Sequence, residues 1–191
     1  ARLRAGETIL IHGGAGGVGL AALQIAKARG AKVIATAGSI EKRRLLETLG
    51  ADHVFNSRTL SFVDDVNSVT DQQGVDVVLN SLFSEAMERS ISLLKPFGRF
   101  LELGKRDFYG DTKIGLRPFR RNVSYFGIDA DQLLNTLPEL STKLLGEIAV
   151  MFERGELSPL RYRAFNPDEI VGAFRLMQGS GHVGKIVVKI P

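Results

Sequence analysis

The stretch IHGGAGGVGLAALQIAK, residues 11–27, places five glycines within positions 13–19 and then continues as a run of helical character. A strand-like apolar segment, TILIHG at 8–13, leads into it. The glycine spacing G-x-G-x-x-G between a strand and a helix is typical of a loop that binds the pyrophosphate of a dinucleotide at the positive end of the helix. The residues expected to bind this pyrophosphate are Gly14, Ala15, Gly16, Gly17, Val18 and Gly19.

The rest of the chain repeats the same alternation of short apolar runs and helical patterns. Strands are predicted at 8–13, 31–38, 52–56, 75–81, 98–104 and 123–128. Helical apolar stripes are predicted at 20–26, 45–49, 62–69 and 86–94, the last ended by Pro96. This alternation predicts an α/β fold, a doubly wound Rossmann sheet of six parallel strands in the order 3-2-1-4-5-6.

The C-terminal part departs from this pattern. A long loop at 105–122 precedes a helical region at 131–153 that Pro138 is expected to interrupt, and a further helix is predicted at 167–178. The strand KIVVKI at 185–190 has no place in a complete six-stranded sheet, so its partner is expected outside this chain. We therefore expect a nucleotide-binding domain at 1–157 and a segment at 158–191 that packs on a substrate domain absent from the sequence. The missing initial methionine also suggests a fragment.

Composition excludes several function classes. The chain has 191 residues and a net charge of +4, but its basic residues occur in clusters of two or three without interleaved aromatics, so no nucleic-acid partner is expected. The absence of cysteine removes disulfides, thiolate nucleophiles and cysteine zinc sites, and fits a cytoplasmic location. No apolar run is long enough for a membrane. The three histidines lack metal-ligand spacing, so no metal site is predicted.

The segment after the second predicted strand bears on which dinucleotide binds. An NAD site places Asp or Glu at the end of that strand, but here it reads Thr-Ala-Gly-Ser at 36–39. The cations at 42–44 oppose the dipole of the helix that follows, which is explained if an anion lies there. Ser39 and Lys42 are thus expected to bind a ribose 2′-phosphate, which favours NADPH; an ordinary basic surface turn is the alternative. An ATP-binding loop is disfavoured because Gly19 is not followed by Lys and Ser or Thr.

Several longer motifs carry a family resemblance. The segment from GETILIHGGAGGVG to ATAGS, at 6–39, resembles zinc-free medium-chain dehydrogenase/reductases of the quinone-reductase type. GVDVVLNSL (74–82), GRFLELGKRD (98–107), RNVSYFGID (121–129) and GHVGKIVV (181–188) narrow it to the enoyl reductase domain of type I polyketide synthases and animal-type fatty acid synthases. The residues of these motifs are most similar to those of mycobacterial lipid-forming synthases, and the resemblance covers nearly the whole chain.

The resemblance implies NADPH-dependent reduction of the α,β-double bond of an enoyl thioester on an acyl carrier protein. Hydride goes to the β-carbon and a proton to the α-carbon. It implies the rest of a multidomain synthase and a second copy of the chain as partners. Arg58 is expected to join Ser39 and Lys42 at the 2′-phosphate. The residues matched to the nicotinamide side are Asn80, Ser81, Leu82, Gly104, Lys105, Phe126 and Gly127.

The proton donor is where the sequence departs from the family. A lysine expected soon after LNSL is absent, and Glu85 stands near its place. A carboxyl there would donate a proton only if burial raised its pKa. Lys105 and Asp107 are the remaining candidates, although a solvated lysine and a turn-capping aspartate explain them equally well. Two other functions stay open, quinone reduction and a non-catalytic NADPH-binding module, and the fragment alone is expected to be inactive or weak.

Overall fold

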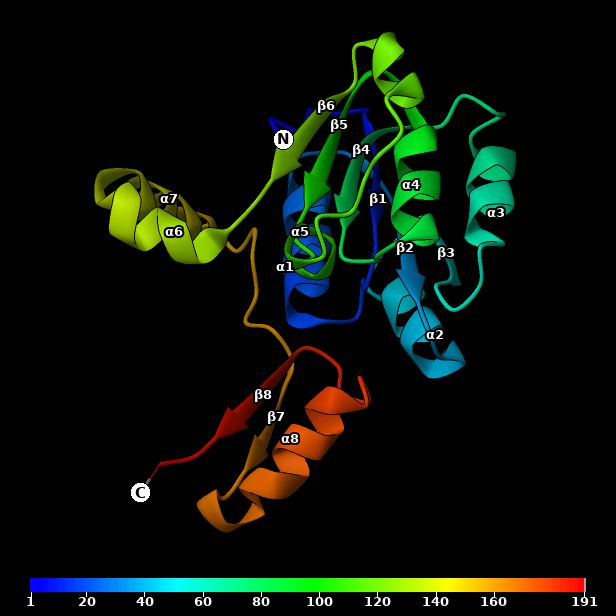
Figure 1. The fold of residues 1–191 in the computed structure, drawn as a ribbon. Helices are drawn as coiled ribbons and strands as arrows, with labels where there is room; N and C mark the ends of the chain where they lie inside the picture. The colour runs from blue at the N-terminus through cyan, green and yellow to red at the C-terminus, as the bar shows by residue number, and fades with distance from the viewer. Residues whose placement is uncertain (191) are drawn as a thin grey trace.

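Residues 1–190, which a computed structural model describes, contain a six-stranded parallel sheet with the strand order β3-β2-β1-β4-β5-β6 (Figure 1). This confirms the predicted Rossmann topology. The strands are β1 (Thr8–Ile11), β2 (Lys32–Ala37), β3 (His53–Asn56), β4 (Val75–Asn80), β5 (Leu94–Glu102) and β6 (Ser124–Gly127).

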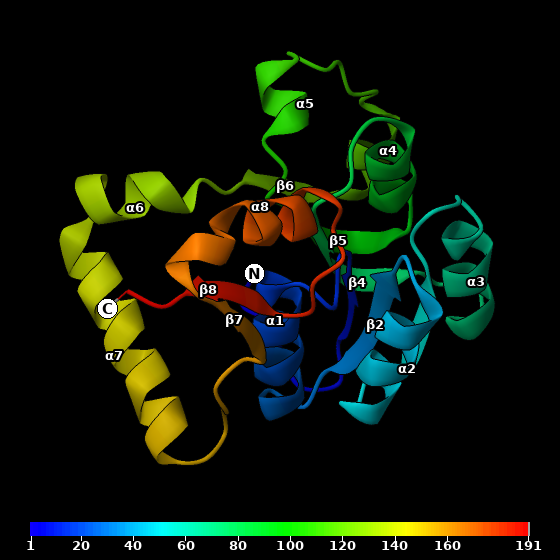
Figure 2. The same ribbon diagram turned by 90° about the horizontal axis from the view of Figure 1, so that it is seen from below.

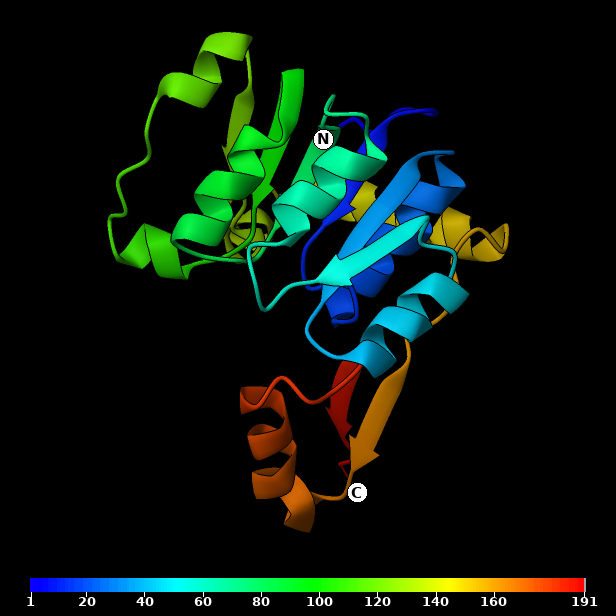
Figure 3. The same cartoon turned by 90° about the vertical axis from the view of Figure 1, so that its right-hand side faces the viewer.

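Helices cover both faces of this sheet, as continuous apolar strands require. On one face, β1 and β2 pack against α1 (Gly17–Ala28) and α2 (Ile40–Thr48) through residues such as Leu23 and Leu46. On the other face, α3 (Phe62–Val69) and α4 (Glu85–Ser92) contribute Phe62 and Met87. Figure 3 shows α3 and α4 on the near face and α1, in blue, beyond the sheet.

The predicted boundary of the fourth helix is wrong by a few residues. The helix α4 ends at Ser92, and Leu94 pairs with Val75 as the first residue of β5. Val75 pairs with Leu94 and Val77 pairs with Arg99, so the register shifts between these two pairs. The segment 95–98, which contains Pro96, therefore forms a bulge in β5. Pro96 therefore interrupts a strand and does not terminate a helix.

The segment between β5 and the C-terminal unit is mostly helical. The predicted long loop contains a short helix, α5 (Arg106–Tyr109), and a 3-10 turn, η1 (Arg117–Arg121). The predicted break at Pro138 is confirmed, since α6 (Ala130–Thr136) ends just before α7 (Pro138–Glu153) begins. Both helices lie to one side of the sheet (Figure 2).

The C-terminal strand has its partner within the chain, which corrects the prediction. In residues 1–190, β8 (Lys185–Val188) pairs in parallel with β7 (Tyr162–Phe165), and the 3-10 turn η2 (Pro167–Glu169) and α8 (Ile170–Gln178) connect them. This β7–α8–β8 unit forms a small two-stranded sheet of its own below the main sheet (Figure 1). Two strands joined by a helix can pair in parallel with each other, so β8 needs no place in the main sheet.

A buried histidine lies beneath the glycine loop. His12 follows β1, is 3% exposed, and its ring makes hydrogen bonds of 2.9 Å to the hydroxyls of Thr36 and Ser90. The Ser90 hydroxyl donates to the carbonyl of Ala86, so it accepts from His12 Nε2–H, and Nδ1 accepts from Thr36. Burial lowers the pKa of His12 to about 3. The ring is thus a neutral structural group.

This lowered pKa makes stability depend on acid. At a pH below 6.5, His12 of the unfolded chain binds a proton. The buried His12 of the folded chain does not, until the pH approaches its lowered pKa of about 3. The free energy of unfolding should therefore fall as the pH drops from 6.5 towards 3, by about 1.4 kcal/mol per pH unit from this group. Urea unfolding at pH 6.5 and 5 should show about 2 kcal/mol more loss for the parent chain than for His12→Gln. Ser68→Ala, at an exposed residue of α3 that does not titrate, is the control and should keep the parent slope.

No helix within residues 1–190 combines the length and apolar character needed to cross a bilayer.

Candidate functional site

The glycine loop closes tightly on the start of α1 at Gly19. Gly16 is the N-cap of α1, and its N–H donates to the carbonyl of Gly13 at 3.0 Å. A Cβ on Gly19 would lie 2.5 Å from the carbonyl oxygens of both Gly13 and Gly14. The first turn of α1 carries no acidic residue. The loop thus presents the positive helix end without a carboxylate to neutralise it.

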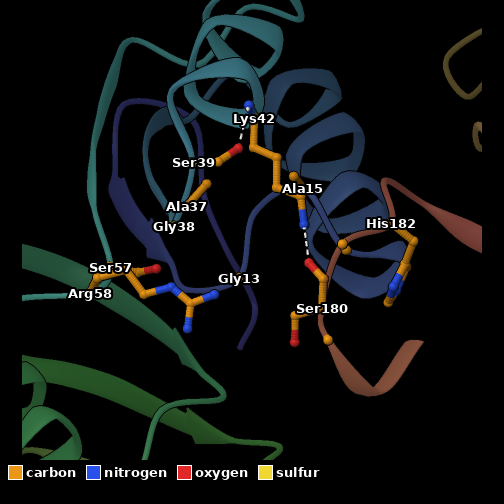
Figure 4. A pocket seen from close by; sticks show the side chains of 13 residues that line it. Gly13, Ala15, Ala37, Gly38, Ser39, Lys42, Ser57, Arg58, Ser180 and His182 are labelled. Atoms are coloured by element: carbon orange, nitrogen blue, oxygen red, sulfur yellow. Dashed lines mark hydrogen bonds between the residues drawn. The ribbon is translucent and has the colours of Figure 1, made fainter. Parts of the chain in front are cut away.

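A cavity of about 540 Å³ opens beside this loop (Figure 4). Its lining combines the loop, the end of β2, the segment after β3 and a turn of the C-terminal unit. The lining residues are Gly13, Ala15, Gly16, Ala37, Gly38, Ser39, Lys42, Ser57, Arg58, Gly179, Ser180, Gly181 and His182. Of the six loop residues predicted to bind the pyrophosphate, Ala15 and Gly16 line the cavity. The cavity also brings them together with Ser39, Lys42 and Arg58, the residues predicted for the 2′-phosphate.

Two cations and, among residues 1–190, no carboxylate line this cavity. Ser39 caps α2, because its side chain accepts from the N–H of Lys42 at 3.3 Å. Arg58 points into the cavity from the side opposite Ser180 and His182 (Figure 4). Its guanidinium lies over Gly38, where a Cβ would approach Nε to 2.5 Å. Burial and the nearby Arg58 charge lower the pKa of Lys42, so an anion placed between them would be stabilised.

The turn of the C-terminal unit that lines the cavity was not predicted from the sequence. The Lys42 ammonium donates to the carbonyl of Ser180 at 2.5 Å, and the N–H of Gly184 donates to the carbonyl of Ala15 at 2.8 Å. The Nδ1 atom of His182 is buried without a hydrogen-bond partner. The glycine-rich turn in GSGHVG was the available signal, but nothing local to it reveals contacts with residues more than 100 positions earlier.

Residues predicted for the nicotinamide side form a second group at the ends of β4 and β5. Asn80 is buried; its amide donates to the carbonyl of Leu82 at 2.8 Å and its carbonyl oxygen accepts from the N–H of Leu82 at 3.2 Å. A Cβ on Gly13 would lie 3.1 Å from the Ser81 hydroxyl, so this group adjoins the glycine loop. Gly104 follows β5 beside it, and its N–H donates to Glu102 at 2.6 Å.

The two candidate proton donors have different surroundings. Lys105 makes ion pairs of 3.0 Å with Asp129 and 2.7 Å with Asp131, which raise the pKa of Lys105. Asp107, in α5, accepts from the N–H of Ser84 at 3.1 Å and from the Thr112 hydroxyl at 2.9 Å. Glu85, which stands near the place where the family resemblance implies a lysine, pairs with Arg89 on the surface of α4.

Val18, Phe126 and Gly127 were also predicted to bind the cofactor. Val18 is exposed in the first turn of α1 and does not line the cavity. Phe126 and Gly127 lie in the edge strand β6, where Phe126 is exposed and a Cβ on Gly127 would contact the Phe108 ring at 3.0 Å. Among residues 1–190, no three His, Cys, Asp or Glu side chains gather to hold a metal.

Comparisons with known proteins agree with this geometry. The profile of the family described as zinc-binding dehydrogenase matches residues 17–145. Phthioceranic/hydroxyphthioceranic acid synthase of Mycobacterium tuberculosis is 46% identical over the whole chain, which spans 9% of the synthase. The chain thus corresponds to a small part of a much longer relative.

Two solved structures show the same fold. The nucleotide-binding subdomain of the enoylreductase domain of PpsC from M. tuberculosis is 44% identical, with a TM-score of 0.78 over 82% of this chain and 88% of that one. Quinone oxidoreductase from Thermus thermophilus, solved also in complex with NADPH, is 31% identical, with a TM-score of 0.85 over all of this chain and 60% of that one.

Proposed function

Since the chain belongs to the zinc-binding dehydrogenase family, among the enoyl reductase domains of polyketide synthases, we propose that it binds NADPH and reduces the α,β-double bond of an enoyl thioester. The thioester is carried on an acyl carrier protein of the same multidomain synthase, which works as a homodimer in polyketide or lipid synthesis. Residues 158–191 pack on a substrate domain of that synthase.

The observation that carries this proposal is the cation-lined cavity beside the glycine loop. The loop leaves no room for a Cβ at Gly19, and the helix that begins there leaves N–H groups for a pyrophosphate. Ser39, Lys42 and Arg58 supply the donors and charge that a 2′-phosphate requires, with no carboxylate among the described lining residues to bind a ribose 2′-hydroxyl. These residues fit NADPH better than NADH.

The second group fits the other end of the same molecule. Asn80, Ser81, Leu82 and Gly104 lie at the carboxyl ends of β4 and β5, where open parallel sheets bind ligands. The bound cofactor supplies the hydride for the β-carbon. These residues hold the nicotinamide ring, with Phe126 and Gly127 at its edge. The proton for the α-carbon must then come from another side chain of the protein.

Lys105 and Asp107 are the two candidates for the source of that proton. Because Asp129 and Asp131 raise the pKa of Lys105, its Nζ gives up a proton only when these ion pairs open. Asp107 already accepts two hydrogen bonds that fix its carboxylate between Ser84 and Thr112. We propose Lys105 as the donor and Asp107 as the group that fixes the segment around it.

The reaction is tested in the full synthase, with the decrease of NADPH absorbance followed by stopped flow after mixing with a crotonyl thioester. Rapid oxidation of NADPH by the thioester supports the proposal. Turnover only with quinones would show the activity of the Thermus thermophilus relative instead. Tight NADPH binding without turnover on either substrate would identify a non-catalytic module.

A further inference from the structure

A buried carboxyl group lies between the two loops proposed to hold the nicotinamide. Glu102 is the last residue of β5 and is 1% exposed. The sheet register places it directly beside Asn80, the last residue of β4. No role at the site was predicted for it, and the reaction proposed above does not use it.

Each oxygen of this carboxyl is bound by a different loop. Oε2 accepts from the side-chain amide of Asn80 at 2.6 Å, and Oε1 accepts from the backbone N–H of Gly104 at 2.6 Å. The same Asn80 amide donates to the carbonyl of Leu82, and its oxygen accepts from the N–H of Leu82. One side chain thus fixes the course of residues 80–82 and of residues 103–104.

Packing alone does not explain this residue. Burial raises the pKa of the Glu102 carboxyl, although the hydrogen bonds from Asn80 and Gly104 oppose the shift. An apolar side chain would fill the same space without that cost, but it would leave the donors of Asn80 and Gly104 without partners. The carboxyl group of Glu102 therefore serves to hold together the two loops to which it is hydrogen-bonded.

We propose that Glu102 is a positioning residue for the nicotinamide ring, holding the loop after β4 and the loop after β5 at the spacing that the ring requires. This inference rests on the proposed binding of NADPH. It adds to that proposal by dividing the binding site into two parts. The loop at 13–19 with Lys42 and Arg58 holds the phosphates, and the Glu102-linked loops hold the nicotinamide.

The test uses Glu102→Gln in the 191-residue chain. Glutamine has nearly the same shape but offers one acceptor and one donor, so an N–H group must face either Asn80 or Gly104 without a partner. The Kd for NADPH should rise about tenfold, because binding must then restore the spacing of the two loops at a cost similar to that of one hydrogen bond. The Kd for adenosine 2′,5′-bisphosphate, which lacks the nicotinamide half, should not change. Bound NADPH should also lose part of its fluorescence shift, and the Gly104 amide should exchange faster with solvent.

Val66→Ala is the matched control for general destabilisation, because Val66 is buried in the core and belongs to α3, which is part of neither loop. It should lower the melting temperature without separating the two ligands. Asn80→Ala removes the other side of the contact and should reproduce the separation if Glu102→Gln does not fold. Equal effects of Glu102→Gln on both ligands, or none on either, would overturn the inference and leave the proposed function intact. If the parent chain binds neither ligand, the proposed cofactor is wrong, and the inference with it.

Discussion

Replacing Gly19 by alanine is expected to weaken NADPH binding about a hundredfold or more, the cost of displacing a loop that closes on the phosphates. The added Cβ would lie 2.5 Å from the carbonyl oxygens of Gly13 and Gly14, which are backbone atoms and have no flexible side chain to move aside. The start of α1 must therefore shift away from β1, taking its free N–H groups out of position. Isothermal titration of NADPH measures the loss.

Gly146→Ala is the matched control, since it adds the same atom. Gly146 lies in α7, and a Cβ there meets no atom within 4 Å. Alanine is favoured over glycine inside a helix by about 1 kcal/mol, so this variant should bind NADPH normally and melt at the same or a slightly higher temperature. Unimpaired NADPH binding by Gly19→Ala would mean that the loop does not hold the phosphates.

The second large effect is expected from Lys42→Ala combined with Arg58→Ala. Each side chain lines the cavity and is proposed to bind the 2′-phosphate, and a hydrogen bond to a charged group contributes about 1.5–3 kcal/mol. The NADPH affinity should fall about a hundredfold or more, while the NADH affinity should change little because NADH has no 2′-phosphate. Parallel titrations with both dinucleotides measure the preference.

Arg44→Ala provides the control for charge alone. Arg44 is an exposed cation on the same helix, α2, but does not line the cavity. It should keep the parent preference, and its small effect on affinity should vanish with added salt. A double variant that still preferred NADPH over NADH would rule out the 2′-phosphate role of Lys42 and Arg58.

Features that depend on local sequence were the ones predicted correctly. The existence of most strands and helices and the break at Pro138 follow from periodicity and backbone chemistry within short windows. The strand order is a long-range feature, and it was predicted only because the strand–helix alternation and the glycine loop match the doubly wound fold. The grouping of Ser39 and Lys42 also follows from spacing within one helix turn. Arg58 was assigned from the family resemblance, and β2 and β3 pair up to Ala37 and Asn56, which brings it nearby.

Features that depend on distant contacts were not predicted. Glu102 reads as one polar residue in an apolar strand until the sheet register places it beside Asn80. The contact from Lys42 to Ser180 joins residues 138 positions apart. The pairing of β8 with β7 was missed for the same reason, because it depends on a short unit folding on itself. The roles of Lys105 and Asp107 stay predictions.

The contact between Gly184 and Ala15 has a thermodynamic consequence for any ligand of the cavity. Such a ligand touches both the main sheet's loop and the C-terminal unit, so it binds fully only when the two are docked. By linkage, its apparent Kd is the intrinsic Kd divided by the docked fraction, and binding in turn protects the 154–161 connection from opening. Anything else that holds the C-terminal unit in place would therefore tighten cofactor binding without touching the cofactor.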